Sequence, residues 1–370
     1  MTQAASGFKA KRSRRGLRYG FSTGACATAA TRAAVSALFG RGFPDPVEIR
    51  LPRGQRVTFP LAEHGIDAEF AHAAVTKDAG DDPDVTHGCL VRVAVRRAAP
   101  GSGVLFRAGP GVGTVTLPGL PLPPGEPAIN PVPRQMMREV VQELAAACGE
   151  RPDVEITVSI PGGEALARRT WNPRLGILGG LSILGTTGIV KPYSCSAWIA
   201  SIQRGIDVAR AAGLDHVAAA TGRISEGAVR ALYGLPDTAI IDMGDFVGGM
   251  LKYLRRHPIP RLSIAGGFGK LAKLAQGALD LHSARSRLRF DLLARRAAEL
   301  GADAALTAAI AAANTARAAL EAALAGGIPL ADAIAADARR TALSQVAGRI
   351  AIEVLIVDRE GRIVGRAAGW

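Results

Sequence analysis

Two patterns of apolar and polar positions follow one another along the chain. In the first part, short stretches with strand-like content lie at 47–51, 55–61 and 89–97, and two further β segments flank a predicted hairpin turn, GPGVG. From about residue 175, apolar stretches that end in glycine (HVAAATG, TAIIDMG and RLSIAGG) each precede a helical stretch. Alternating strands and helices are typical of a parallel, doubly wound sheet. The chain is therefore expected to be α/β, with an α+β N-terminal domain and a Rossmann-like domain after it.

The predicted elements also divide the chain. Residues 18–39 predict a strand or turn followed by a helix that Ser22 or Thr23 caps. A helix at about 134–148 and a strand at 153–160 close the first domain. We expect a basic, disordered arm at 1–16, an α+β domain at 17–165, a Rossmann-like α/β domain at 166–285, and a helical segment with a final β-hairpin at 286–370.

Composition narrows the function classes. Hydrophobic residues make up 48% of the chain, yet no uncharged apolar run reaches the ~18 residues that suggest a membrane span. The basic N-terminus has no apolar core after it, which argues against a secretory signal and for a cytoplasmic protein without a membrane partner. The four cysteines are scattered and the six histidines show no paired metal spacing, so we expect no metal site.

The net charge of +13 favours an anionic partner. Part of the excess lies in the first eighteen residues, as either a solvated tail or a nucleic-acid-binding arm. That arm lacks the interleaved aromatic residues that stack on bases, and the rest of the chain stays basic without it. The positive charge thus allows a small anionic ligand, and the missing aromatic residues disfavour nucleic acid as the partner.

Glycine-rich loops are the main candidate for ligand binding. GILGGLSILGTTGIVKP, at 176–192, has P-loop glycine spacing but no lysine, so a triphosphate is disfavoured. We expect this loop and the loops at Thr221–Arg223, Asp242–Asp245 and Gly266–Lys270 to share the carboxyl edge of one sheet. S-adenosylmethionine fits such loops, because backbone N–H groups can hold its carboxylate and an aspartate its ribose. The alternatives are tight βα turns without a ligand, or a dinucleotide.

The expected donor-binding residues come from all four loops. They are Gly179, Gly180, Ser182, Gly185, Thr186, Thr187, Gly188, Thr221, Gly222, Asp242, Gly244, Gly266 and Gly267.

Polar segments of the first domain offer further candidates. The stretch VTKDAGDDPDVTHG (75–88) concentrates carboxylates and His87; it could bind a divalent cation, supply a proton acceptor, or form a surface turn. The stretch Ser22–Gly24 could be a helix cap alone or an anion-binding helix start. Three basic side chains beside Gly/Pro-rich segments are either carboxylate partners or solvated charges: Arg134, Arg174 and Lys191.

Several long stretches together resemble the cobalt-precorrin-5B C(1)-methyltransferase family of anaerobic cobalamin biosynthesis. They include LRYGFSTGACATAA, VTKDAGDDPDVTHG, NPRLGILGGLSILGTTGIVKP and GGFGKLAKLAQGALDLHS, in the family's order, over about 17–283. The resemblance implies methylation of C-1 of cobalt-precorrin-5B to cobalt-precorrin-6A with S-adenosylmethionine as donor. Cobalt then belongs to the substrate, a polycarboxylate tetrapyrrole that suits a basic protein.

On this resemblance the second domain would hold the donor and the first would face the tetrapyrrole. Candidate bases are Asp82 and His87. The residues expected to face the substrate are Ser22, Thr23, Gly24, Asp78, Asp81, Arg134, Arg174 and Lys191. A homo-oligomer and a transient handover with neighbouring corrin-pathway enzymes stay open.

Two rival functions predict different ligands. An ATP- or NAD-dependent enzyme could use the same strand-end loops and would ignore S-adenosylmethionine. An RNA-binding protein would use the basic arm and bind in a salt-sensitive way.

Overall fold

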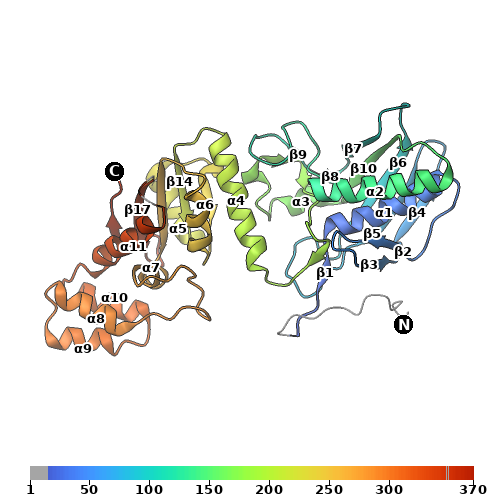
Figure 1. Ribbon diagram of the computed structural model, residues 1–370. Helices are drawn as coiled ribbons and strands as arrows, with labels where there is room; N and C mark the ends of the chain where they lie inside the picture. The colour runs from blue at the N-terminus through green and yellow to red at the C-terminus, as the bar shows by residue number, and fades with distance from the viewer. Residues whose placement is uncertain (1–15, 347, 349) are drawn as a thin grey trace. The chain divides into compact units, whose positions relative to one another are not determined.

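The computed structural model describes residues 16–346, 348 and 350–370 (Figure 1). The expected basic arm therefore lies outside the described residues, apart from Gly16. The chain forms two compact units, Met1–Ser194 (unit 1) and Cys195–Trp370 (unit 2). The boundary expected at 165/166 thus falls inside unit 1.

Unit 1 is built on a five-stranded sheet. Its strands are β4 (Glu63–Ile66), β5 (Ala71–Thr76), β6 (Leu90–Arg97), β10 (Val154–Ser159) and β7 (Val104–Ala108), in that order. Neighbours are antiparallel except β10 and β7, which run parallel. A separate hairpin joins β2 (Val47–Arg50) to β3 (Arg56–Phe59).

Two helices cover this sheet. α1 (Thr23–Leu38) packs on β5 and β6, and α2 (Pro131–Cys148) lies beside α1 (Figure 1). The Ser22 side chain caps α1, as predicted, and its small buried residues allow close approach to the alanines of β5. α2 begins at a proline and ends before Gly149, whose φ of 66° suits a left-handed cap. The helix expected at 134–148 is confirmed with an earlier start.

Short two-residue strands attach the glycine-rich segment to unit 1. β11 (Ile177–Leu178) pairs with β9 (Thr114–Val115), and β12 (Gly180–Leu181) pairs with β8 (Gly111–Val112). β13 (Ile189–Val190) pairs with β1 (Gly20–Phe21). The expectation that this loop opens the Rossmann-like sheet is wrong: its backbone finds its hydrogen-bonding partners in unit 1.

GPGVG is also not a hairpin turn. β7 pairs with β10, whereas β8 pairs with β12, so the strands on either side of GPG do not pair with each other. The remaining short elements are α3 (Gly163–Ala167) and η1 (Pro173–Leu175) in unit 1, and η2 (Asp237–Ala239), which lies between α5 and β15 in unit 2.

Unit 2 is a doubly wound sheet, as the sequence predicted. Its strands, in order, are β15 (Ile240–Asp242), β14 (His216–Ala220), β16 (Arg261–Gly267), β17 (Ala351–Val357) and β18 (Ile363–Ala367). The first four are parallel and β18 is antiparallel, forming the predicted final hairpin with β17.

Helices cover both faces of this sheet. α5 (Arg223–Tyr233) packs on the face that carries Ala218 and Ala265. The opposite face, with Ala219 and Ile264, packs against α4 (Cys195–Ala211), α6 (Val247–Leu254), α7 (Phe268–Ala275) and α11 (Leu330–Val346). The helical stretch expected at 286–348 contains α8 (Phe290–Glu299), α9 (Ala304–Ala311), α10 (Ala316–Ala325) and α11.

Strand order fixes where a ligand can bind in unit 2. The chain passes from β14 outward to β15 and then returns to β16 on the other side of β14. This reversal is a topological switch point, outside whose carboxyl strand ends open α/β sheets bind their ligands.

Candidate functional site

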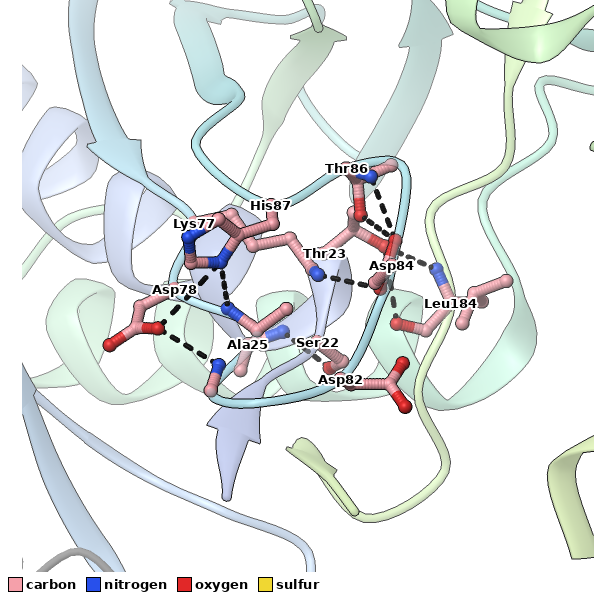
Figure 2. A network of polar contacts seen from close by, with 12 residues as sticks. Ser22, Thr23, Ala25, Lys77, Asp78, Asp82, Asp84, Thr86, His87 and Leu184 are labelled. Atoms are coloured by element: carbon pink, nitrogen blue, oxygen red, sulfur yellow. Dashed lines mark hydrogen bonds and ion pairs between the residues drawn. The ribbon is translucent and has the colours of Figure 1, made fainter. Parts of the chain in front are cut away.

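Three segments that are distant in the sequence meet at the start of α1. The Gly24 amide donates to the Leu184 carbonyl (2.9 Å), and the Leu184 amide donates to Thr23 Oγ1 (3.0 Å). The Ser22 amide donates to the Gly188 carbonyl (2.9 Å). Figure 2 shows this junction beside the 77–87 loop. The glycine-rich loop, the helix start and the acidic loop therefore form one cluster within unit 1.

Gly185 is required for that contact. Its φ is +129°, and a Cβ at this position would lie 2.1 Å from Ser22 Oγ. The absence of a side chain thus lets the loop pack directly on the helix cap.

The first amides of α1 are already used within the protein. The Ala25 amide donates to Ser22 Oγ (3.2 Å) and the Gly24 amide to Leu184. Ser22–Gly24 could be a helix cap alone or an anion-binding helix start. Because these two amides donate to protein groups, they fit the helix cap. The hydroxyl of Thr23 is engaged as well, and all three residues are buried.

A buried ion pair holds the acidic loop. Lys77 is 1% exposed and its Nζ donates to Asp84 Oδ2 (2.7 Å). Asp84 Oδ1 accepts from the Thr86 amide (2.8 Å) and hydroxyl (2.6 Å). Burial by itself would raise the pKa of Asp84, but the charge of Lys77 and these hydrogen bonds outweigh it and lower the pKa below 3.8. Asp84 therefore acts as an ionised anchor of the loop.

Arg18 binds Asp78 and Asp81, two of the residues expected to face the substrate. Its guanidinium makes a forked pair with Asp78, including an Nη2–Oδ1 distance of 2.9 Å, and its amide donates to Asp81 Oδ2 (2.6 Å). The hydrogen bond from Arg18 is the main cause that lowers the pKa of Asp78. Asp78 and Asp81 thus join the segment just before β1 to the loop.

Asp82 and His87 remain the residues of this loop with room for chemistry. Burial raises the pKa of Asp82, although the Tyr193 amide donates to its Oδ1 (2.8 Å) and opposes that shift. In Figure 2 its carboxylate points away from the Lys77–Asp84 pair. His87 is exposed, and its Nδ1 accepts from the Ala79 amide (3.1 Å). Its Nε2 is therefore the ring nitrogen left for a ligand.

Tyr193, which the sequence did not single out, is held in an unusual conformation. Its φ is +54°, a left-handed value that, within the described part of the chain, glycines otherwise account for. Such a backbone costs about 1–2 kcal/mol. The Asp82 hydrogen bond fixes it, and the residue is 68% exposed.

The expected basic ligands have different environments. Arg134 donates to the carbonyls of Ile129 (2.8 Å) and Pro127 (2.9 Å) and pairs with Glu126, so it stabilises the turn before α2. Arg174 is partly buried in η1. Lys191 is exposed just after β13 and is the accessible cation of the three.

Structural contacts also explain part of the glycine-rich segment. Gly180 lies against the backbone of Gly111, where a Cβ would come within 2.4 Å, and Ser182 Oγ donates to Asn172 Oδ1 (3.4 Å). Gly179 is exposed, with nothing within 4 Å of an added Cβ. Thr186 is exposed, and the Thr187 hydroxyl bonds back to Ile189.

The other expected donor ligands do lie at one sheet edge. Thr221 and Gly222 follow β14, and Asp242 ends β15. Gly266 and Gly267 are the last two residues of β16, with Gly266 beside Thr221. Gly244, with φ +52°, lies against the indole of Trp198, whose Nε1 donates to the Asp242 carbonyl (3.2 Å). The expected set of four loops on one edge is therefore corrected to three, because 179–188 belongs to unit 1.

Two broader features bear on the class of site. Among the described residues there is no cluster of three or more His, Cys, Asp or Glu side chains placed to hold a metal ion. The helices of the described chain include none that is long and apolar enough to span a membrane.

Comparison with known proteins places this α/β protein in a family. Residues 10–192 match CbiD and residues 280–368 match the CbiD C-terminal domain. The chain is 60% identical over 352 residues to "Cobalt-precorrin-5B C(1)-methyltransferase" of Paramagnetospirillum magneticum, covering 95% of this chain and 98% of that protein. The Brucella abortus protein of the same name is 58% identical over 351 residues, 95% of each chain. The chain belongs to the CbiD family, which confirms the resemblance noted above.

A crystal structure of the cobalamin biosynthesis protein (cbiD) from Archaeoglobus fulgidus is 27% identical. It covers 73% of this chain and 83% of that one, with a TM-score of 0.40.

Proposed function

We propose that this protein is a cobalt-precorrin-5B C(1)-methyltransferase of cobalamin biosynthesis. The observation that carries this proposal is the identity of 58–60% over 95% of the chain to relatives of that name. The alignment with the Paramagnetospirillum magneticum relative covers 352 of the 370 residues, so it includes the segments of the cluster in unit 1 and the strand-end loops of unit 2.

We assign S-adenosylmethionine as the methyl donor and unit 2 as the unit that binds it. The loops after β14, β15 and β16 lie at a switch point, the place where parallel sheets hold nucleoside ligands. Asp242 ends the strand next to β14, where a carboxylate can accept hydrogen bonds from ribose hydroxyls. Gly222 and Gly267 leave room for the ligand to approach the backbone, whereas Gly266 lies against Thr221.

The tetrapyrrole is assigned to unit 1. The exposed side chains of Lys191 and His87 and the half-buried Asp82 come from the segments that meet at the start of α1. Lysine can pair with substrate carboxylates. We also assign the Gly185–Gly188 loop to this side, because its hydrogen bonds are to Ser22–Gly24.

The protein contributes to this reaction mainly by aligning the reactants, rather than by forming covalent bonds with them. The donor supplies an electrophilic methyl group on sulfur. An electron pair of ring carbon C-1 forms the new carbon–carbon bond, the carbon–sulfur bond breaks, and its electrons stay on sulfur in S-adenosylhomocysteine. The protein must orient the two reactants and exclude water. We assign any proton released from the ring to Asp82 or His87.

Anaerobic incubation of the purified protein with S-adenosylmethionine and cobalt-precorrin-5B tests the proposal. Mass spectrometry should show a gain of one methyl group, and NMR should place it at C-1. An intact substrate after incubation with demonstrably folded protein would refute the function. ATP and NAD binding would then be measured, because the rival nucleotide-dependent enzyme would use the same unit 2 loops.

A further inference from the structure

One side chain ties together three loops at the carboxyl edge of the unit 2 sheet. Lys270, in the first turn of α7, donates from Nζ to the carbonyl of Thr221 (3.2 Å). The same Nζ lies 3.1 Å from Asp245 Oδ1. These residues follow β16, β14 and β15 respectively, and β14 pairs with both other strands. The Lys270–Asp245 pair therefore sits at the switch point itself.

The pair is accessible to a ligand. Asp245 Oδ1 is buried, and Lys270 Nζ, 3.1 Å away, is its partner in the described chain. The Lys270 and Asp245 side chains are 38% and 23% exposed, so a ligand can reach both. One cation and one anion, both partly exposed, thus lie side by side where a ligand is expected.

We infer that Lys270 and Asp245 bind the amino-acid end of the methyl donor, with the carboxylate on Lys270 and the ammonium on Asp245. The inference rests on the proposed function and adds the residues that recognise the donor's zwitterion. A nucleotide phosphate would satisfy Lys270 but would bring no donor to Asp245.

Four ligands separate the two charges in a binding experiment on the full-length protein. S-adenosylhomocysteine has both groups, its decarboxylated form only the ammonium, its deaminated form only the carboxylate, and 5′-methylthioadenosine neither. Lys270→Met should weaken the two carboxylate-bearing ligands by about 10- to 100-fold in calorimetric titration and spare the other two. Asp245→Asn should weaken the two ammonium-bearing ligands instead.

Matched variants keep the result interpretable. Lys252→Met removes an exposed lysine of α6 in the same unit and should leave all four affinities unchanged. Lys270→Arg keeps the charge and should retain the preference for carboxylate-bearing ligands, which covers the case that the methionine variant does not fold.

Two results would overturn the inference. Equal weakening of all four ligands by Lys270→Met would mean that the pair only supports the loops, and no weakening at all would mean that the zwitterion binds elsewhere. If the unaltered protein methylates its substrate but shows either result, the inference alone fails. Absence of methylation would instead refute the proposed function.

Discussion

Lys77 carries a full charge into the interior of unit 1, and Asp84 is what makes that burial tolerable. The ammonium is 1% exposed and its hydrogen bond to Asp84 is 2.7 Å long. A lysine is almost never fully buried unless it is paired, because its charge loses hydration. The same pair places the loop that carries Asp82 and His87.

Removing the charge of Asp84 should therefore destabilise the protein strongly. We expect Asp84→Asn to lower the free energy of unfolding by roughly 3 kcal/mol, because it leaves Lys77 buried without its counter-charge. Urea denaturation measures this change. Glu48→Gln, which breaks the exposed pair with Arg56, is the control and should cost less than about 1 kcal/mol. Similar losses of unfolding free energy in both variants would contradict the stabilising role of the buried Lys77–Asp84 pair.

The same residue predicts sensitivity to acid. The folded-state pKa of Asp84 lies below 3.8, so the stabilisation it gives is complete above that value and is lost as the pH falls through the folded pKa. The unfolding free energy of the unaltered protein should fall below about pH 4. In Asp84→Asn this fall should be shallower. Equal acid slopes in the two proteins would rule out the contribution of Asp84.

Asp82 is expected to control the pH dependence of turnover. Burial raises its pKa, so the base form is lost at a higher pH than for an exposed carboxyl. If Asp82 is the base, Asp82→Asn lowers turnover by about 10²–10⁴-fold and removes that acidic limb, while keeping an oxygen for the Tyr193 amide. His87→Ala is the parallel variant. Full turnover with unchanged pH profiles in both would remove the two residues as candidate bases.

At the scale of the element, the 184–188 loop depends on close packing against the α1 cap. Leu184 exchanges two hydrogen bonds with Thr23 and Gly24, and Gly185 touches Ser22. The loop has few partners of its own, since β13 is only two residues long. Its position is therefore set by α1.

Two glycine variants test this dependence. Gly185→Ala combines a positive φ with a Cβ 2.1 Å from Ser22 Oγ, so we expect the loop to leave the cap and corrinoid affinity to fall at least about tenfold. Gly179→Ala has a similar backbone strain, with φ +82°, but open space around the new Cβ. It should cost only about 1 kcal/mol of stability and leave affinity unchanged. Equal affinities in the two variants would show that the cap contact is unimportant for binding.

At the scale of the molecule, the hydrophobic clusters of the two units share no residue. The core of unit 1 draws on α1, α2 and the sheet around β5, whereas the larger core of unit 2 lies between its parallel sheet and helices such as α6 and α11. Cores that share no residue need not unfold together, so a single two-state transition is not required.

Calorimetry should resolve two thermal transitions that respond to different changes. Asp84→Asn should lower one midpoint by roughly 5–10 °C, because the lost pair belongs to unit 1. S-adenosylhomocysteine at about 100 times its Kd should raise the other midpoint by a comparable amount, because ligand binding stabilises the unit that holds it. If S-adenosylhomocysteine instead raises the midpoint that Asp84→Asn lowers, the donor binds to unit 1.

Much of the fold follows from local sequence. The Ser22 cap and the alanine-rich stretch after it specify α1, and the strand–glycine–helix rhythm specifies the doubly wound sheet of unit 2. These features depend on contacts within a few residues or on a repeated pattern. β5 was missed because AHAAVT has weak strand propensity, and its extended form comes from pairing with β6 and packing under α1.

The sequence by itself determined the family, the fold class and the segments that carry the candidate chemistry. The tertiary structure decided which segments belong together. Strands of two residues, such as β11, β12 and β13, are too short for a sequence pattern to predict which strands they pair with. It moved the glycine-rich loop to unit 1 and showed that Asp78, Asp81 and Arg134 are already engaged by protein groups. It also brought Lys270 to Asp245, since only the parallel pairing of β14 with β15 and β16 makes their loops neighbours.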